Sequence, residues 1–321
     1  MEGRLRIKKR KKKKKTKKNF RLIVLILAVL MVAEIFHLIS VNDHLNIEDL
    51  NIAFYIEAAD DASQNRIQIN WQYLAAIDCV RYNHDFSKAD YQSVIALANL
   101  FVVEKPSSDK NTPPEYRLRS LPAVMGKLAF TTEQKAKVYH YLQDLEYVGL
   151  VNNKACFLEK ESAKLEFIDS LTGEAMSGYY QYGIFPSITI AQAILESGWG
   201  TSVLSVQGHN LFGIKADSSW EGKYLTMKTM EYYNSQTCAN FRKYQNVSEC
   251  MQDHGEFLNS NQRYRQNGVF DAAYYVEQAQ ALENAGYGTK TDKNGNKIYA
   301  DLLIEIIKQY NLQLIDYKVQ S

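Results

Sequence analysis

The residue of this chain with the clearest chemical potential is Glu196, which follows a run of apolar residues that begins near Ser187. Isoleucine, alanine and leucine fill nearly every face of the helix predicted there, which indicates a buried helix, and Gly198 and Gly200 end it. Apolar surroundings and the negative end of the helix dipole both disfavour a carboxylate, so we expect a raised pKa for Glu196. A carboxyl that keeps its proton near neutral pH can protonate a leaving group. The simpler alternative is a glutamate that turns outward into solvent.

A second acid, Glu231, stands at the end of a predicted strand, Tyr224 to Glu231. Side chains alternate along a strand, so Glu231 shares one face with Leu225 and Met227. Cleavage of a glycosidic bond passes through an oxocarbenium-like state. The reaction needs one carboxyl group that protonates the leaving oxygen and one carboxylate that activates water or stabilises the cation. Glu196 and Glu231 would supply this pair, whereas the plain alternative for Glu231 is a solvated surface charge.

The residues around these acids follow an ordered series of motifs. Glu196 lies in AQAILESGWG, and NLFGIK (210–215), FRKY (241–244) and AGYGT (285–289) come after it. In this order and at these spacings, the motifs resemble those of the bacterial cell-wall N-acetylglucosaminidases of glycoside hydrolase family 73. The resemblance covers about residues 167–314. It implies a lysozyme-like fold, hydrolysis of the β-1,4 bond after N-acetylglucosamine in peptidoglycan, and Glu196 as the general acid.

The resemblance also implies roles for other residues. The family places its second glutamate in a small β-lobe, where Glu231 lies, although the acetamido group of the substrate can assist in its place. Tyr287 matches a family tyrosine near the cleaved bond, but residues 290–297 lengthen the loop after it and could displace it. Further candidates for sugar contacts are Trp199, Asn210, Phe212 and Trp220. Trp220 is the favoured stacking platform because it stands in a predicted loop, while aromatic residues of such a domain more often serve as core.

Charge is distributed unevenly along the chain, although the net charge is only +2. Thirteen of the 38 basic residues lie in residues 1–21, and from Ser40 onward 25 basic residues face 34 acidic ones. The basic segment directly precedes an apolar segment, residues 22–41, which is long enough to span a bilayer. Because positive charge stays on the cytoplasmic side, this order predicts a membrane anchor and an extracellular remainder rather than a nucleic-acid-binding tail. No small-x-small cleavage site follows, so we expect the anchor to be retained.

Residues 42–160 are long enough for a small domain of their own, and their pattern is helical. A Ser-x-x-Asp pattern from Ser87 to Asp90 predicts the start of a helix that continues to Val103. Thr131 to Gln134 forms a second capping box. The role of this domain stays open among a spacer, a glycan-binding module and a dock for a partner.

The four cysteines, Cys79, Cys156, Cys238 and Cys250, would lie outside the cell, where an even number can pair. Pairing of the first two and of the last two is one natural arrangement, and buried thiols without disulfides are the alternative. No metal-ligand spacing is present, and His209 has no second ligand beside it. The sequence therefore implies neither a metal nor an organic cofactor.

These observations predict an α+β, mainly α, chain of four parts. A basic cytoplasmic tail (1–21) and a transmembrane signal anchor (22–41) come first. A helical extracellular domain of unknown role (42–160) follows. The last part is a lysozyme-like catalytic domain with a small antiparallel β-lobe (161–321).

The function we infer is that of a membrane-anchored β-N-acetylglucosaminidase. Peptidoglycan glycan strands would lie between the helical lobe with Glu196 and the β-lobe with Glu231, and the bond to N-acetylmuramic acid would be cleaved. A lytic transglycosylase is the nearest alternative, because it shares the fold and needs only one acid. A non-catalytic scaffold for wall binding or division also stays open, because residues 42–160 are unexplained. The sequence leaves undecided endo or exo action, the anomeric configuration of the product and any protein partners.

Overall fold

The computed structural model describes residues 44–105, 114–231 and 235–321, without the side chains of residues 229–237. The predicted basic tail and anchor lie outside these ranges. None of the helices in the described ranges combines the length and apolar character that a membrane crossing requires. The described chain is mainly helical and carries three separate two-stranded antiparallel sheets, which confirms the predicted class.

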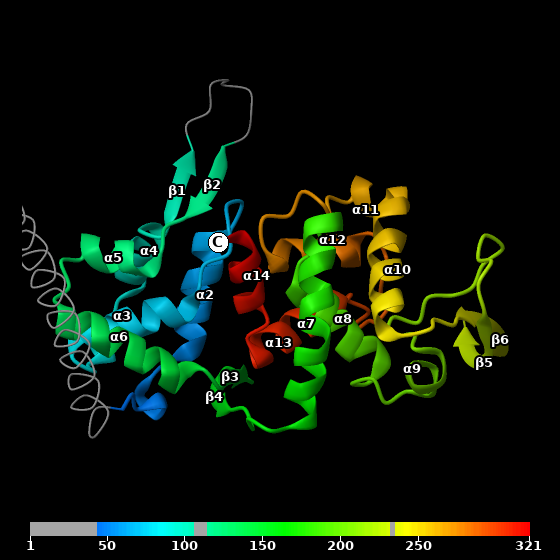
Figure 1. The fold of residues 1–321 in the computed structure, drawn as a ribbon, viewed down its shortest axis with the longest axis horizontal. Helices are drawn as coiled ribbons and strands as arrows, with labels where there is room; N and C mark the ends of the chain where they lie inside the picture. The colour runs from blue at the N-terminus through cyan, green and yellow to red at the C-terminus, as the bar shows by residue number, and fades with distance from the viewer. Residues whose placement is uncertain (1–43, 106–113, 232–234) are drawn as a thin grey trace, which may run out of the picture.

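In the first part of the fold, up to about residue 157, the described residues form five helices and two hairpins around one apolar core (Figure 1). The helices are α2 (Ile52–Ser63), α3 (Trp71–Tyr82), α4 (Tyr91–Asn99), α5 (Leu121–Lys127) and α6 (Thr132–Leu145). Short 3-10 turns are η1 (Ile47–Asp49) and η2 (Phe86–Lys88). The hairpins are β1 (Val102–Lys105) with β2 (Glu115–Leu118), and β3 (Val148–Val151) with β4 (Lys154–Phe157). This part is therefore not purely helical.

Local sequence explains these elements only in part. The capping box at Thr131 is present, with reciprocal hydrogen bonds between Thr131 and Gln134. Asp90, rather than Ser87, caps α4, and this helix ends at Asn99, short of the predicted Val103. The β3–β4 hairpin turns through Asn152 and its neighbour Asn153, which both adopt positive φ angles, the conformation that a tight hairpin turn requires.

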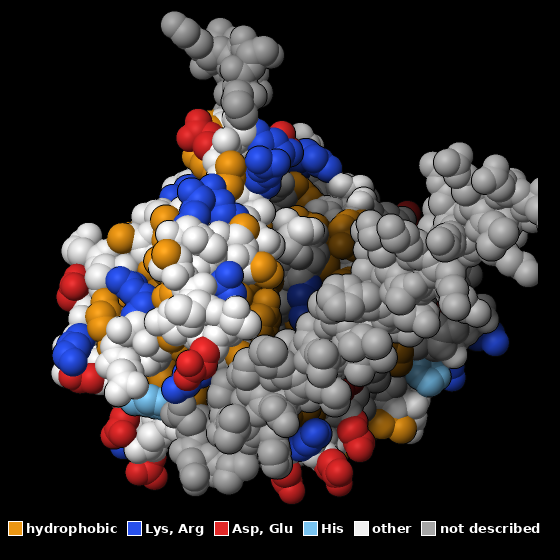
Figure 2. Space-filling view, turned by 60° about the vertical axis from the view of Figure 1, so that its left-hand side comes forward, with side chains coloured by type: hydrophobic (Ala, Val, Ile, Leu, Met, Phe, Trp, Pro, Cys, Tyr) orange, Lys and Arg blue, Asp and Glu red, His pale blue; other side chains and the backbone are white. Residues whose placement is uncertain are grey.

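The surface of this first part carries mixed charge. Lysine and arginine side chains gather near the base of the projecting β1–β2 hairpin, with acidic side chains beside them, and further acidic side chains lie toward the opposite edge (Figure 2). Apolar side chains are scattered between them. Such a surface is ordinary for a globular domain and does not by itself assign a ligand.

The second part contains the predicted catalytic segment. Its helices are α7 (Ala163–Tyr182), α8 (Pro186–Ser197), α9 (Val203–Gly208), α10 (Val247–Ser260), α11 (Gln262–Gln266), α12 (Tyr275–Asn284), α13 (Tyr299–Tyr310) and α14 (Gln313–Gln320). Its hairpin, β5 (Tyr224–Glu231) with β6 (Ser235–Arg242), stands at one end of the molecule (Figure 1). Helix α8 packs against α7, α12, α13 and α14. All its isoleucines and alanines are buried, which confirms the prediction of a buried helix.

Both ends of α8 are fixed by specific contacts. At its start, the buried carboxylate of Asp316 in α14 accepts hydrogen bonds from the backbone N–H of Ser187, at 2.9 Å, and from the Ser187 hydroxyl. These bonds satisfy a backbone group that has no partner within the helix. At its end, Gly198 takes a left-handed conformation with φ +57° and donates to the carbonyl of Ile194. Glu196 therefore lies in the last turn of a helix whose two ends are both fixed by hydrogen bonds.

The two parts meet in a buried, hydrogen-bonded interface. The indole N–H of Trp71 donates to Asn311 Oδ1 at 3.1 Å, and the Asn311 amide donates to the carbonyl of Val148. Gly149 of β3 lies so close to the backbone of Gln309 in α13 that a side chain would collide there. The domain boundary near residue 160 stays a prediction, because the two apolar cores, which lie on either side of it, are in contact through this interface.

The sequence also left open whether the four cysteines form disulfides. Among the described residues, none of the four forms a disulfide. The sulfur of Cys79 lies 3.4 Å from Nδ1 of His84, and Cys250 accepts a hydrogen bond from the N–H of Leu211 at 3.3 Å. Burial raises the pKa of the Cys250 thiol to about 12, so it stays protonated. The structure thus has thiols instead of the two disulfides.

Candidate active site

A cleft of about 560 Å³ opens beside the C-terminal end of α8. Five segments distant in the sequence form it: the end of α8, the NLFGIK turn with Asp217 just after it, Phe241 of β6, helix α11 with the preceding end of α10, and the loop that leads into α13. The side chains that give it chemical character are Glu196, Phe212, Lys215, Asp217, Arg263, Tyr264, Tyr287, Lys290 and Tyr299. The cleft therefore joins two carboxyl groups, one of them at a helix end, with tyrosines and cationic groups.

Glu196 is exposed to this cleft, yet protein surrounds it closely enough for burial to raise the pKa of its carboxyl. A hydrogen bond from Tyr299 and the positive charge of Lys290 favour the ionised form and oppose this rise, but their effect is smaller. The Tyr299 hydroxyl also accepts a hydrogen bond from the buried amide of Gln192 at 3.1 Å. Gln192 and Tyr299 thus hold the carboxyl in place, and its raised pKa suits a proton donor.

Tyr287 lies in the cleft together with Glu196, so the longer loop after it does not displace it from there. Its ring stacks on that of Tyr299, with the centroids 5.6 Å apart. Gly288 permits this approach, because a side chain at that position would collide with the Tyr299 ring. Burial and the nearby charge of Glu196 raise the pKa of Tyr287 well above its usual value, so its hydroxyl remains a hydrogen-bond donor.

The NLFGIK turn supplies another wall of the cleft through Phe212. The Phe212 ring stacks on the buried imidazole of His254, with the centroids 3.8 Å apart. Asn210 shapes the turn, since its Oδ1 accepts hydrogen bonds from the N–H groups of Phe212 and Ile214. Its Nδ2 donates to the carbonyls of Ile214 and Arg242. At 1% exposure, Asn210 holds the loop and does not line the cleft, in contrast to the predicted sugar contact.

The two tryptophans suggested as sugar platforms are engaged in packing. Trp199 packs against Phe167 and Tyr310, with ring centroids 6.0 and 5.0 Å away. Trp220 donates from its indole to the carbonyl of Lys223 at 2.9 Å, and the guanidinium of Arg242 lies 4.6 Å from the centre of its ring. Neither belongs to the described residues that line the cleft, so the structure favours packing roles for both.

Glu231 is the last residue of β5, and its backbone pairs with Ser235 of β6. Its side chain lies outside the described part of the structure, so its role as second carboxylate stays a prediction. The same hairpin reaches the cleft through Phe241 of β6.

Sequence reasoning missed several residues of the cleft. Tyr299, which contacts Glu196, follows the lengthened loop and belongs to none of the motifs. Arg263 and Tyr264 stand in a short helix without a motif, and they are joined by a hydrogen bond between guanidinium and hydroxyl. A tyrosine that follows a polar loop is a weak signal, and only the packing of α13 against α8 makes Tyr299 significant.

The part of the chain that forms the cleft is similar in sequence to known proteins. Residues 173–312 match the family described as mannosyl-glycoprotein endo-beta-N-acetylglucosaminidase. The chain is 38% identical over 174 residues to the exo-glucosaminidase LytG of Bacillus subtilis, which is 51% of this chain and 59% of that protein. It is 37% identical over 151 residues to the peptidoglycan hydrolase FlgJ of Salmonella typhimurium, which is 45% of each.

Among solved structures, the catalytic domain of the autolysin Auto from Listeria monocytogenes is 30% identical, with a TM-score of 0.42. That match covers 58% of this chain and 98% of the autolysin domain. The chain spans only about half the length of the two curated relatives named above. The family match thus makes residues 173–312 the part of the chain that is similar to a glucosaminidase domain.

Proposed function

We propose that this protein is a peptidoglycan hydrolase that cleaves the β-1,4 bond between N-acetylglucosamine and N-acetylmuramic acid. The observation that carries the proposal is the position of Glu196, which accepts a hydrogen bond from Tyr299 in the cleft of a segment that matches the glucosaminidase family. The names of two relatives, a glucosaminidase and a peptidoglycan hydrolase, support the same reaction. We include in this proposal that the catalytic domain has a lysozyme-like fold.

In the proposed mechanism, Glu196 protonates the glycosidic oxygen as the bond breaks. Tyr299 orients the carboxyl, and the protonated Tyr287 hydroxyl donates a hydrogen bond to the sugar at the cleaved bond. Either Glu231 or the acetamido group of the substrate stabilises the positive charge that develops at the anomeric carbon. Cationic groups in the cleft, among them Lys290 and Arg263, suit the carboxylates that muramic acid and its stem peptide carry.

Analysis of the products tests this proposal directly. A hydrolase delivers water to the anomeric carbon, so digestion of purified peptidoglycan should create new reducing ends on N-acetylglucosamine. Borohydride reduction followed by mass spectrometry detects these ends as reduced N-acetylglucosamine at the ends of the fragments. A lytic transglycosylase instead closes the muramic acid ring on its own hydroxyl, and the resulting anhydro-muramyl fragments would refute the hydrolase.

The same assay measures the contribution of Glu231. A Glu231→Gln protein should release less reduced N-acetylglucosamine than the wild type, but more than a Glu196→Gln protein if the acetamido group assists. An unchanged yield would remove Glu231 from the mechanism and leave the role of Glu196 unaffected.

We further propose that residues 22–41 anchor the protein in the cytoplasmic membrane with the catalytic domain outside. The support is the basic segment that precedes this apolar segment. Protease added to intact cells should remove the catalytic domain and spare the basic tail, while a cytoplasmic marker protein stays intact. Protection of the catalytic domain until the membrane is lysed would contradict this orientation.

A further inference from the structure

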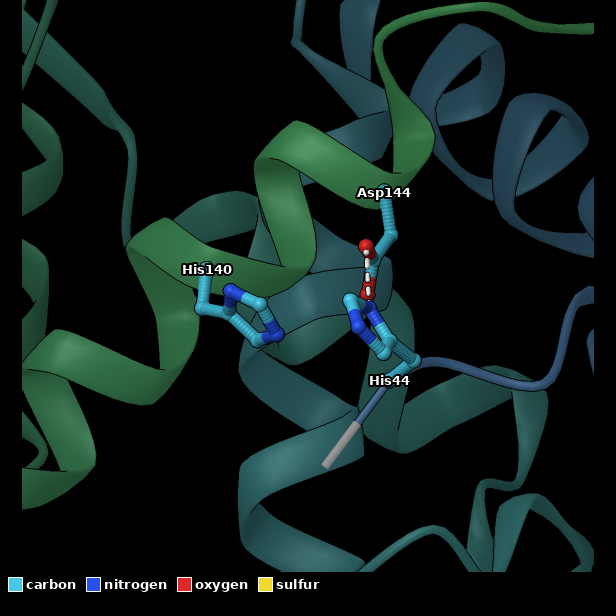
Figure 3. Close-up of side chains that lie close together, drawn as sticks. All are labelled: His44, His140 and Asp144. Carbon is cyan, nitrogen blue, oxygen red and sulfur yellow. Dashed lines mark hydrogen bonds and ion pairs between the residues drawn. The ribbon is translucent and has the colours of Figure 1, made fainter. Parts of the chain in front are cut away.

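Three side chains outside the cleft converge at the N-terminal edge of the described chain. His44 precedes η1, and His140 and Asp144 lie in the second half of α6 (Figure 3). Each offers one potential ligand atom, and these atoms all lie within 4.8 Å of one another. The spacing of four residues places His140 and Asp144 on one face of α6, and His44 completes the group from a segment about a hundred residues earlier.

Specific contacts hold the group together. Nδ1 of His44 lies 3.0 Å from Oδ1 of Asp144, while the other oxygen of Asp144 accepts a hydrogen bond from the N–H of Leu45 at 2.9 Å. The imidazole rings of His44 and His140 are tilted against each other, with their centroids 5.0 Å apart. The Asp144 carboxylate is therefore already oriented toward His44 by a backbone donor, as the supporting hydrogen bonds around metal ligands commonly do.

The third member has an unsatisfied polar atom. His140 is only 7% exposed, and its Nε2 has no hydrogen-bond partner within the described part of the chain. Its ring is directed toward His44 (Figure 3). A buried ring nitrogen without a partner costs free energy unless a ligand satisfies it. Its nearest potential ligand atoms belong to His44 and Asp144, which makes a shared ion the natural partner.

We propose that His44, His140 and Asp144 bind a divalent transition-metal ion of the zinc type. Two imidazoles and one carboxylate form a donor set that suits zinc and not magnesium or calcium, which prefer oxygen ligands alone. Ligand atoms around a tetrahedral zinc lie about 3.4 Å apart, so small adjustments of the three side chains close the set. Water completes the coordination. The ion would hold residues 44 and 45, which follow the predicted anchor, against α6.

Zinc binding by the whole protein tests this site. The full chain, without an affinity tag that contains histidine and kept in detergent, is stripped of metal by a chelator and titrated with zinc against a chelating dye. We expect one equivalent to bind and to raise the Tm, because an ion that binds only the folded state stabilises it. His44→Gln should weaken binding at least about tenfold, since one of three protein ligands is lost. The side chain of His44 is 64% exposed, so this variant keeps the fold.

The matched control removes a histidine elsewhere. His209→Asn, at a helix end where asparagine tolerates the left-handed backbone, should bind zinc like the wild type. Magnesium in excess should not displace the zinc. The assignment is overturned if the wild type takes up no zinc, if His44→Gln binds it as tightly, or if His209→Asn loses it equally.

Discussion

Replacement of Glu196 by glutamine should lower the turnover of peptidoglycan by at least about 10²-fold. The amide has the same shape as the carboxyl, so it can still contact Tyr299, but it cannot give a proton to the leaving oxygen. The loss should fall on turnover rather than on substrate binding, because the proton is transferred only as the bond breaks. Release of reducing sugar from purified peptidoglycan measures the effect.

A matched substitution controls for the loss of a negative charge from the same domain. Glu305 is an exposed residue of α13 that is not among the described residues of the cleft, and Glu305→Gln should retain wild-type turnover. Thermal unfolding of both variants at the wild-type temperature would confirm that the folds are intact. Wild-type release of sugar by the Glu196→Gln protein would remove the general acid from the mechanism.

The largest effect on stability is expected from Asp316→Ala, which should lower the free energy of unfolding by about 2 to 5 kcal/mol. This change leaves the N–H and hydroxyl of Ser187 buried without their acceptor and opens a cavity at the start of α8. Because α8 carries Glu196 at its other end, activity should be lost at a lower temperature as well. Urea unfolding followed by circular dichroism measures the free energy.

The pH dependence of this effect has a definite sign. Burial raises the pKa of Asp316 to about 7, so the folded protein holds a proton that the unfolded chain releases near its ordinary pKa of 3.8. The stability linked to this proton is complete below about pH 4 and is lost as the pH rises to about 7. Asp316→Asn cannot titrate, so the wild type should lose stability relative to it over that interval. A difference between the two proteins that does not change with pH would refute the raised pKa.

The sequence predicted the elements whose signals are local. Helix α8 was evident because apolar residues cover all its faces and Gly198 ends it, and the strand predicted at Tyr224 to Glu231 has the bounds of β5. These signals depend on the residues themselves and on their period, and tertiary contacts do not reverse them.

The sequence could not show which way a side chain faces. Asn210 and Trp199 belong to motifs and were therefore expected to contact sugar, but the buried backbone groups of the turn use all the polar atoms of Asn210. Tyr299 gains its role only when α13 packs against α8. His140 and Asp144 form a helical pair that the sequence could have revealed, whereas His44 joins them only through the fold.

The interface of Trp71, Asn311 and Val148 limits how far the cleft can move relative to the N-terminal part of the chain. A buried contact with defined hydrogen bonds restricts the relative motion of the two parts, in contrast to a catalytic domain on a flexible linker. If the chain is fixed in the membrane just before His44, the first part of the fold holds the cleft at a nearly constant distance from the membrane. If the protein hydrolyses peptidoglycan as proposed, one molecule would then reach only the wall within about one protein length of its anchor, and cleavage elsewhere would require the whole molecule to diffuse in the membrane.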